Sequence, residues 1–224
     1  MIMDGNRRWA RENGLSAVML GHKSGVESVK VAIKFCIKKG IKYLSLFTFS
    51  IENFRRDKTE QSYIFDLLVD VIKNDLLDLI KNGIRIRFIG DRKFFPEKVR
   101  SVISEVEEKT KHLTNLNLNM LFCYGARQEI VNAAKKVAKK VSDGILSVDE
   151  IDESEFRNNL WTDDIPDADL VVRTGKVSRL SNFLLFQSAY SELMFLDCYW
   201  PEINEDRLRY CFDDFHGVQR NFGK

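Results

Sequence analysis

Short apolar runs recur along the chain, and several of them alternate between apolar and polar residues, which is the pattern of a strand. The runs cover Tyr43–Phe49, Ile84–Ile89, Leu116–Cys123, Ala168–Val172 and Leu193–Leu196. Each of the five predicts a β-strand.

Longer segments carry apolar residues three or four positions apart, the spacing of one helix face. They cover Ser24–Lys39, Thr59–Asn82, a stretch opened by Pro96, Gly125–Val141 and Asn204–Asn221. Strands that alternate with helices need crossover connections. The pattern therefore predicts one α/β domain over residues 1–224, with a mostly parallel central sheet flanked by helices. Ligands of such sheets bind beyond the carboxyl ends of the strands.

The composition narrows the class of protein. Hydrophobic residues make up 44% and charged residues 30% of the 224 residues, which is enough to bury a core and excludes global disorder. Lys and Arg number 35 against 33 Asp and Glu. This near balance argues against bulk binding of nucleic acid, so any anion site must be local.

Several observations bear on the cellular location. No run is long enough to span a bilayer, and no signal peptide is visible. The four cysteines form no C-x-x-C pair and lie among apolar residues, so we expect reduced core thiols in a cytoplasmic protein rather than disulfides or a zinc site. The first apolar run is cut to three residues before Asp4, so we expect the natural chain to begin upstream of Met1.

The first candidate site is the segment Met3-Asp4-Gly5-Asn6-Arg7-Arg8-Trp9, in which an acidic residue ends a strand and two arginines open a helix. A helix start and guanidinium groups bind anions, and the Asp4 carboxylate would hold a hard cation that bridges to the anion. An ordinary turn with Asp4 as the helix cap fits these residue types equally well.

Two more predicted strand ends carry arginines. Thr48–Arg56 (TFSIENFRR) places a hydroxyl, an amide and paired guanidinium groups after a strand. Val172–Asn182 (VRTGKVSRLSN) brings Arg173, Arg179 and Ser181 within reach of one phosphate. Each segment alone also fits a solvated loop. Three such ends in one sheet would converge on one crevice, which favours a polyanionic ligand.

Two further features are ambiguous on residue types alone. His22, just before a predicted helix, fits a general acid or base, a phosphate donor or a structural residue, whereas His112 and His216 are expected at the surface. The helix over Thr59–Asn82 is apolar over a broad face, which either packs in the core or lines an elongated cavity. A phosphate-binding mouth over an apolar cavity would suit a lipid phosphate.

Four motifs in this order, MDGNRRWA, GHKSG, TFSIENFRR and RLSNFLLFQSAYSELMF…WPE, resemble the cis-prenyltransferases, most closely the bacterial undecaprenyl diphosphate synthases. The resemblance runs from Met1 to the segment Arg220-Asn221-Phe222-Gly223. It implies a homodimer with an apolar tunnel, Mg²⁺ as cofactor, and sequential condensation of isopentenyl diphosphate onto an allylic diphosphate, normally farnesyl diphosphate. The implied product is undecaprenyl diphosphate, a lipid carrier precursor for cell-wall synthesis. Because such a product is insoluble in water, we expect transient membrane contact on its release.

The resemblance also implies roles for individual residues. Asp4 is the catalytic metal-site aspartate, Glu192 joins the metal site across the dimer, and Asn53 takes part in catalysis within the second motif. The implied substrate-binding residues are Gly5, Asn6, Arg7, Arg8, Trp9, His22, Ser50, Glu52, Arg56, Arg173, Arg179 and Ser181.

Two positions depart from the family pattern. Lys176-Val177 stands where the family has Gly-Glu, and no basic residue lies in the stretch just before Gly21-His22. The first departure motivates an alternative hypothesis, a catalytically weak or silent subunit that binds prenyl diphosphates. A nucleotide-binding Rossmann domain is disfavoured, because no G-x-G-x-x-G follows a strand and no P-loop motif is present.

Overall fold

The computed structural model describes residues 1–219. The end of the helix predicted over Asn204–Asn221 and the Arg220–Gly223 segment lie outside the described residues.

All strand pairs are parallel, as the crossover pattern predicts. β1 (Tyr43–Ser50), β3 (Leu116–Tyr124) and β2 (Ile84–Ile89) form one sheet in the order β1-β3-β2. β4 (Leu170–Arg173) pairs with β5 (Glu192–Phe195). Each strand lies within two residues of its prediction at either end, because runs of this kind are a local signal.

The N-terminal residues connect the two groups of strands. The Phe47 N–H donates to the Met1 carbonyl at 3.0 Å, the Ile2 N–H donates to the Val172 carbonyl at 2.8 Å, and Ile2 forms a parallel bridge with Arg173. Met1–Met3 therefore lies between β1 and β4 and makes one continuous layer. The carboxyl ends of β1, of this segment and of β4 meet at the same edge.

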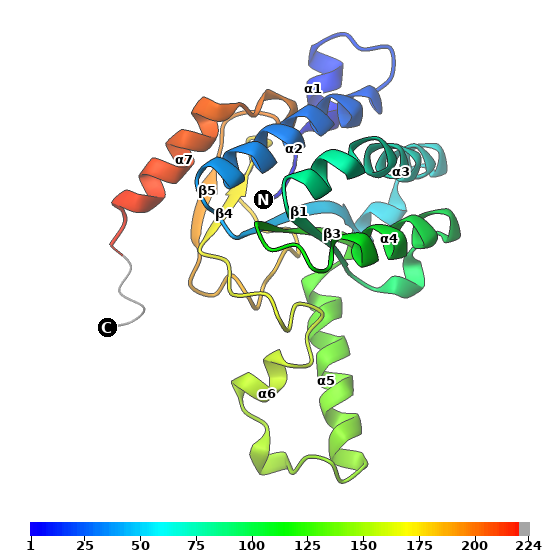
Figure 1. Cartoon of the computed structure of the whole chain (residues 1–224), viewed down its shortest axis with the longest axis vertical. Helices are drawn as coiled ribbons and strands as arrows, with labels where there is room; N and C mark the ends of the chain where they lie inside the picture. The colour runs from blue at the N-terminus through cyan, green and yellow to red at the C-terminus, as the bar shows by residue number, and fades with distance from the viewer. Residues whose placement is uncertain (220–224) are drawn as a thin grey trace.

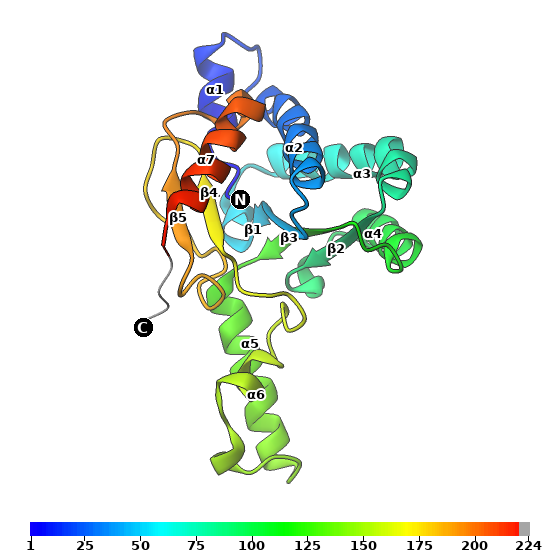
Figure 2. The same ribbon diagram turned by 60° about the vertical axis from the view of Figure 1, so that its left-hand side comes forward.

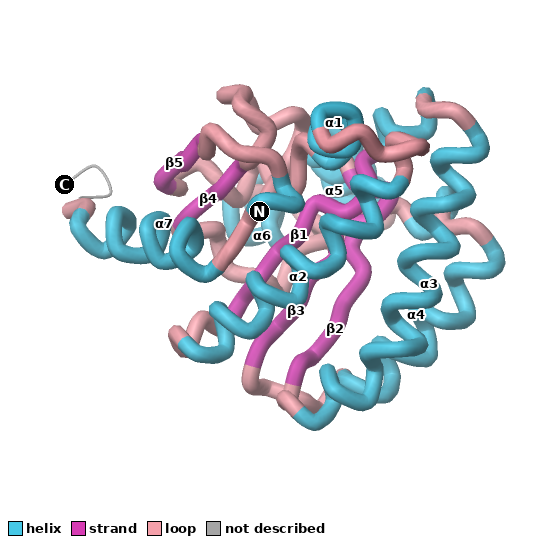
Figure 3. The backbone as a smooth tube through the Cα atoms, turned by 90° about the horizontal axis from the view of Figure 1, so that it is seen from above, coloured by secondary structure: helices cyan, strands magenta, loops and turns pink. Residues whose placement is uncertain are grey.

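Seven α-helices surround the layer within residues 1–219 (Figures 1 and 3). They are α1 (Asn6–Glu12), α2 (Leu20–Lys38), α3 (Lys58–Lys81), α4 (Glu97–Thr110), α5 (Ala126–Ser142), α6 (Glu153–Arg157) and α7 (Glu205–Gly217). Pro96 caps α4, as predicted for a proline at a helix start. In Figures 1 and 2, α5 and α6 project from the body at the end opposite α1.

Two apolar clusters cover the two faces of the layer. Leu44, Leu46 and Phe122 pack with residues of α2, α3, α4 and α7, whereas their neighbours Leu121 and Tyr124 pack with Phe183 and other residues on the opposite face. This alternation explains why the β3 sequence is apolar at nearly every position, since both of its faces are buried.

Aromatic rings fill the space between α3, α4 and the sheet. The Phe122 ring lies 5.0 Å from that of Phe95 and 5.7 Å from that of Phe65, and Phe49 lies 5.0 Å from Phe65, measured between ring centroids. The broad apolar face of α3 thus serves core packing here. The apolar tunnel stays a prediction.

The positions predicted for the four cysteines and for two of the histidines are confirmed. The four cysteines are free and buried, and burial raises the pKa of Cys36 to about 12. His112 and His216 are exposed. Within residues 1–219, no helix is long and apolar enough to cross a membrane.

Candidate functional site

A cavity of about 710 Å³ opens at the carboxyl ends of β1, of the N-terminal segment and of β4. Each of the three predicted strand ends contributes to its wall. The predicted site residues that line it are Asp4, Ser50, Glu52, Asn53, Arg56, Arg173, Arg179 and Ser181. The convergence predicted from three arginine-bearing strand ends is therefore confirmed.

Asp4 is fixed by contacts to both of its neighbouring elements. Its carboxylate accepts a hydrogen bond from Arg173 Nη2 at 2.8 Å and lies 3.1 Å from Arg8 Nη2. The Thr174 hydroxyl donates to the Asp4 carbonyl at 2.7 Å. Gly175 allows this approach, because a Cβ at that position would lie 2.8 Å from Asp4 Cγ. The φ of +96° at Gly175 also favours glycine.

Arg173 ties Asp4 to the loop that follows β4. It is 4% exposed, and its Nη1 donates to the Ser181 hydroxyl at 2.9 Å and to the Arg179 carbonyl. Ser181 and Asn182 both have positive φ, 52° and 67°, a conformation that costs energy for residues other than glycine. Backbone strain held by packing is common where a site is preorganised.

Asn182 links this loop to two other walls of the cavity. Its amide nitrogen donates to Glu52 Oε1 at 2.8 Å and to Gln128 Oε1 at 3.0 Å, and its Oδ1 accepts from the Arg127 N–H at 2.8 Å. The sequence analysis did not select Asn182 or Arg127, although both line the cavity. Asn182 lies in the loop after a predicted strand and Arg127 lies at the start of a predicted helix, and these positions could have identified them.

The second motif forms a short 3-10 helix over Ile51–Arg55. The Ser50 N–H donates to Asn53 Oδ1 at 3.1 Å, and the Ser50 side chain accepts from the Asn53 backbone in return. This reciprocal cap fixes the Asn53 side chain at the cavity and leaves its NH₂ group as the donor available to a ligand.

A second group of predicted residues meets at Glu60, which the sequence analysis missed. Glu60 is 6% exposed; its carboxylate lies 3.1 Å from His22 Nε2, 3.2 Å from Arg56 Nη1 and 3.7 Å from Arg7 Nη1. Burial lowers the pKa of His22, and the hydrogen bond to Glu60 opposes that effect. His22 lies inside the first turn of α2 rather than before it, because α2 begins at Leu20.

Tyr199 lies beside two cations of the site. The Arg8 guanidinium carbon is 5.3 Å and Lys176 Nζ 4.7 Å from the centroid of its ring, and its hydroxyl lies 2.5 Å from Glu12 Oε1. Lys176, which departs from the family pattern, is thus seated on an aromatic ring next to Arg8 and has a left-handed φ of 58°.

Seven of the predicted residues are not part of the cavity wall: Gly5, Asn6, Arg7, Arg8, Trp9, His22 and Glu192. Gly5 and Asn6 form the turn into α1, where the Asn6 amide donates to the Met3 carbonyl at 3.2 Å, and Trp9 is half-buried on α1. Glu192 begins β5 opposite Leu170, whereas Arg173 pairs with Phe195. Within one chain Glu192 therefore lies about 10 Å from Arg173 along the strand direction, since strands rise about 3.3 Å per residue.

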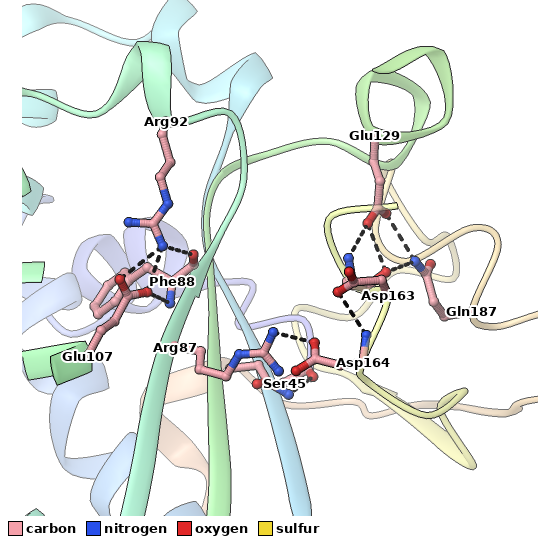
Figure 4. Close-up of polar contacts among 11 residues, drawn as sticks. Ser45, Arg87, Phe88, Arg92, Glu107, Glu129, Asp163, Asp164 and Gln187 are labelled. Atoms are coloured by element: carbon pink, nitrogen blue, oxygen red, sulfur yellow. Dashed lines mark hydrogen bonds and ion pairs between the residues drawn. The ribbon is translucent and has the colours of Figure 1, made fainter. Parts of the chain in front are cut away.

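A buried polar network behind the cavity fixes the start of α5. Glu129 accepts from the Tyr124 hydroxyl at 2.5 Å and from the Thr162 hydroxyl at 2.8 Å. It also accepts from Gln187 Nε2 at 3.0 Å (Figure 4). Burial raises the pKa of Tyr124. The network joins β3, α5 and the segments around Thr162 and Gln187, so the elements that carry Arg127 and Ser181 keep one arrangement.

Comparison with known proteins gives consistent results. A family model described as "Putative undecaprenyl diphosphate synthase" matches residues 2–223. The chain is 43% identical over 223 residues to an isoprenyl transferase of Clostridium perfringens, covering 100% of this chain and 88% of that protein. It is 38% identical over 223 residues to a ditrans,polycis-undecaprenyl-diphosphate synthase, farnesyl-diphosphate specific, of Micrococcus luteus, covering 100% and 89%.

Among solved structures, the chain is similar to the lavandulyl diphosphate synthase of Lavandula x intermedia in complex with dimethylallyl diphosphate. The TM-score is 0.95 and the identity 33%, over 100% of this chain and 96% of that chain. Similarity of fold thus extends over the whole chain.

Proposed function

The chain belongs to the undecaprenyl diphosphate synthase family of cis-prenyltransferases, and we propose that it condenses isopentenyl diphosphate sequentially onto an allylic diphosphate, farnesyl diphosphate, to make undecaprenyl diphosphate. The observation that carries the proposal is the convergence of Asp4, Asn53, Arg173, Arg179 and Ser181 on one cavity at the strand ends. Such a product serves as a lipid carrier precursor in cell-wall synthesis. Nothing in the site favours a silent subunit, since the predicted residues of the cavity are present and in contact.

The residues divide between the two diphosphates. Arg7, Arg8 and His22, with the turn at Gly5 and Asn6, are proposed to hold the allylic diphosphate, while Arg173, Arg179 and Ser181 hold that of isopentenyl diphosphate. Negative charge builds on the allylic diphosphate as it leaves, and guanidinium groups at the half-buried site stabilise that charge. Because both diphosphates are held by fixed groups, the double bond and the developing cation are oriented for attack. The space between the two diphosphates is lined by Ser50, Glu52, Asn53 and Arg56. Trp9 is proposed to border the substrate from α1, outside this cavity wall.

Dependence on Mg²⁺ is typical of the family, and Asp4 fits that ion. Mg²⁺ is usually bound by one or two carboxylates together with substrate phosphates, and the Asp4 carboxylate is 29% exposed beside the cavity. No group of three His, Cys, Asp or Glu side chains that could hold a metal occurs in residues 1–219, so we propose that the substrate supplies the remaining ligands. When bound, the ion supplies charge stabilisation to the leaving diphosphate.

We also propose a homodimer formed through the edge strand β5. Leu193 and Phe195 are 45% and 37% exposed and share one face of that strand, and an exposed apolar edge strand favours pairing with another chain. Dimerisation is the proposed way in which Glu192 reaches the metal site of the partner.

We place the enzyme in the cytoplasm on account of its buried free cysteines, with transient membrane contact when the apolar product leaves.

The test is a condensation assay with labelled isopentenyl diphosphate, farnesyl diphosphate and Mg²⁺, in which extracted lipids are resolved by length. Wild-type protein should form long products that EDTA abolishes. Asp4→Asn should lower the rate by about a thousandfold, because it removes the chain's own carboxylate from the proposed metal site, a loss of several kcal/mol. Unchanged turnover in Asp4→Asn would contradict the proposed role of Asp4.

A further inference from the structure

The cavity carries more positive charge than its own acids neutralise. Its wall contains four arginines, Arg56, Arg127, Arg173 and Arg179, against two acids, Asp4 and Glu52. Arg56 pairs with Glu60 and Arg173 with Asp4, but no carboxylate within residues 1–219 lies at ion-pair distance from Arg127 or Arg179. Two guanidinium groups that line one cavity without acidic partners indicate an anionic ligand, because arginine forms bidentate contacts with phosphate.

Arg127 is the second residue of α5, and Asn182 already occupies the first N–H groups of that helix. The Ala126 N–H donates to the Asn182 carbonyl at 2.9 Å, and the Arg127 N–H donates to Asn182 Oδ1 at 2.8 Å. These two backbone N–H groups are therefore not available to a ligand. An anionic ligand at this point would be bound by the Arg127 side chain. A cation in the first turn of a helix is unfavourable unless an anion lies nearby, which argues against a purely structural role.

We propose that Arg127 is a further substrate-binding residue and that it holds, together with Arg179, the diphosphate of isopentenyl diphosphate. The inference rests on the proposed function and assigns Arg127 to one of its two substrates. The contact with Asn182 places Arg127 beside the loop of Arg179 and Ser181, whereas Arg7 and His22 gather at Glu60. Arg173 supports the assignment, because its buried Nε has no hydrogen-bond partner among the described residues of the same wall.

The experiment measures binding and turnover for the full-length protein and three variants. Arg127→Gln removes the positive charge, and Arg127→Lys keeps the charge but lacks the paired N–H donors of a guanidinium group. The control, Lys135→Gln, removes one charge from an exposed position of the same helix that does not line the cavity. Calorimetry gives the affinity for isopentenyl diphosphate without turnover. The KM for each substrate then shows which diphosphate is affected.

We expect Arg127→Gln to bind isopentenyl diphosphate roughly ten- to a hundredfold more weakly, which is the usual value of a charge-assisted hydrogen bond. Its KM for isopentenyl diphosphate should rise by the same factor, with an unchanged KM for farnesyl diphosphate. Arg127→Lys should be intermediate and Lys135→Gln should match wild type. The melting temperature of Arg127→Gln should not fall, since the variant removes a cation from the positive end of a helix.

Three results would overturn the assignment: equal affinity in wild type and Arg127→Gln, an equal loss in Lys135→Gln, or equal effects on both substrates. Failure of the proposed function looks different. Wild-type protein that binds isopentenyl diphosphate through Arg127 but elongates no allylic diphosphate would leave the binding site intact and refute the reaction. Wild-type protein that binds no isopentenyl diphosphate would refute both.

Discussion

At the scale of single residues, Glu60 organises the cationic side of the site. A buried carboxylate is costly unless its charge is compensated, and three cationic or hydrogen-bonding side chains, those of Arg7, His22 and Arg56, surround this one. The sequence offered no signal for this role, because Glu60 stands near the start of an amphipathic helix. Arg7 and His22 lie far from it along the chain, and only the packing of α1 and α2 against α3 brings them together.

His22 makes stability depend on pH because its side chain is buried. Burial lowers its pKa in the folded protein below the usual value of about 6.5. Below pH 6.5 the His22 side chain is protonated in the unfolded chain but still neutral in the folded protein. The contribution of neutral, buried His22 to the free energy of unfolding is therefore complete above pH 6.5 and is lost as the pH falls towards the folded pKa. We expect the free energy of unfolding of wild type, relative to His22→Gln, to decrease between pH 7 and pH 5 by at most about 1.4 kcal/mol per pH unit.

Urea unfolding at several pH values measures this difference. His112→Gln is the control, because His112 is exposed and its loss should leave the pH profile unchanged. A wild-type advantage over His22→Gln that grows on acidification would show that His22 is charged in the folded state.

At the scale of elements, the sequence predicted what local patterns determine. Period-two runs and glycine stops fixed β1, β2 and β3 and the ends of α2 and α3 within a few residues, and polar residues after strands identified most of the cavity wall. The contacts of Asn182 with Arg127 and Glu52 were not predictable, because they depend on how the loop after β4 packs against α5 and the 3-10 helix. The seating of Lys176 on Tyr199 is a long-range contact of the same kind.

The packing of α1 against α2 depends on one glycine. A Cβ at Gly21 would lie 2.0 Å from the carbonyl oxygen of Asn6, a backbone atom that cannot move without α1. Alanine in a helix is otherwise favourable by about 1 kcal/mol, so any loss of stability in Gly21→Ala reports this clash. We expect a loss of about 1–3 kcal/mol, the usual cost of overpacking, and a higher KM for the allylic diphosphate because Arg7 and Arg8 move with α1.

Thermal unfolding and steady-state kinetics check both effects. Gly217→Ala is the matched control, since nothing lies within 4 Å of a Cβ at that position, and its stability should stay the same or rise by up to about 1 kcal/mol. Equal stability of the two variants would mean that α1 can shift freely and that the Gly21 contact does not position it.

At the scale of the whole molecule, the two carboxylates of the proposed metal site lie far apart within one chain. Asp4 lies at the carboxyl end of the layer, and Glu192 lies at the amino end of the edge strand β5. Glu192 lies about 10 Å along the strand direction from Arg173, the ion-pair partner of Asp4, and rotation of a side chain cannot close that distance. Under the proposed function, a second chain must therefore bring its own Glu192 to the site. The exposed Leu193 and Phe195, which follow Glu192 on β5, give such a pairing an apolar contact.

Disruption of that contact should separate the chains. Leu193→Asp is expected to shift the protein from dimer to monomer in sedimentation velocity and to lower activity at least tenfold, because a buried unpaired carboxylate costs several kcal/mol. Leu77→Asp, at a position of α3 that is 72% exposed, should remain dimeric and active. A monomeric and active wild type would remove the basis for placing Glu192 in the site.

Mixing two inactive chains separates a role across the dimer from a role within one chain. If Glu192 acts on its partner, a dimer of one Asp4→Asn chain and one Glu192→Gln chain has one site with both carboxylates intact and one site with neither. Random pairing of equal amounts makes half of the dimers mixed, so the mixture should recover about one quarter of wild-type activity after subunit exchange. If Glu192 acted within its own chain, every site in the mixture would lack one carboxylate, and no activity would return.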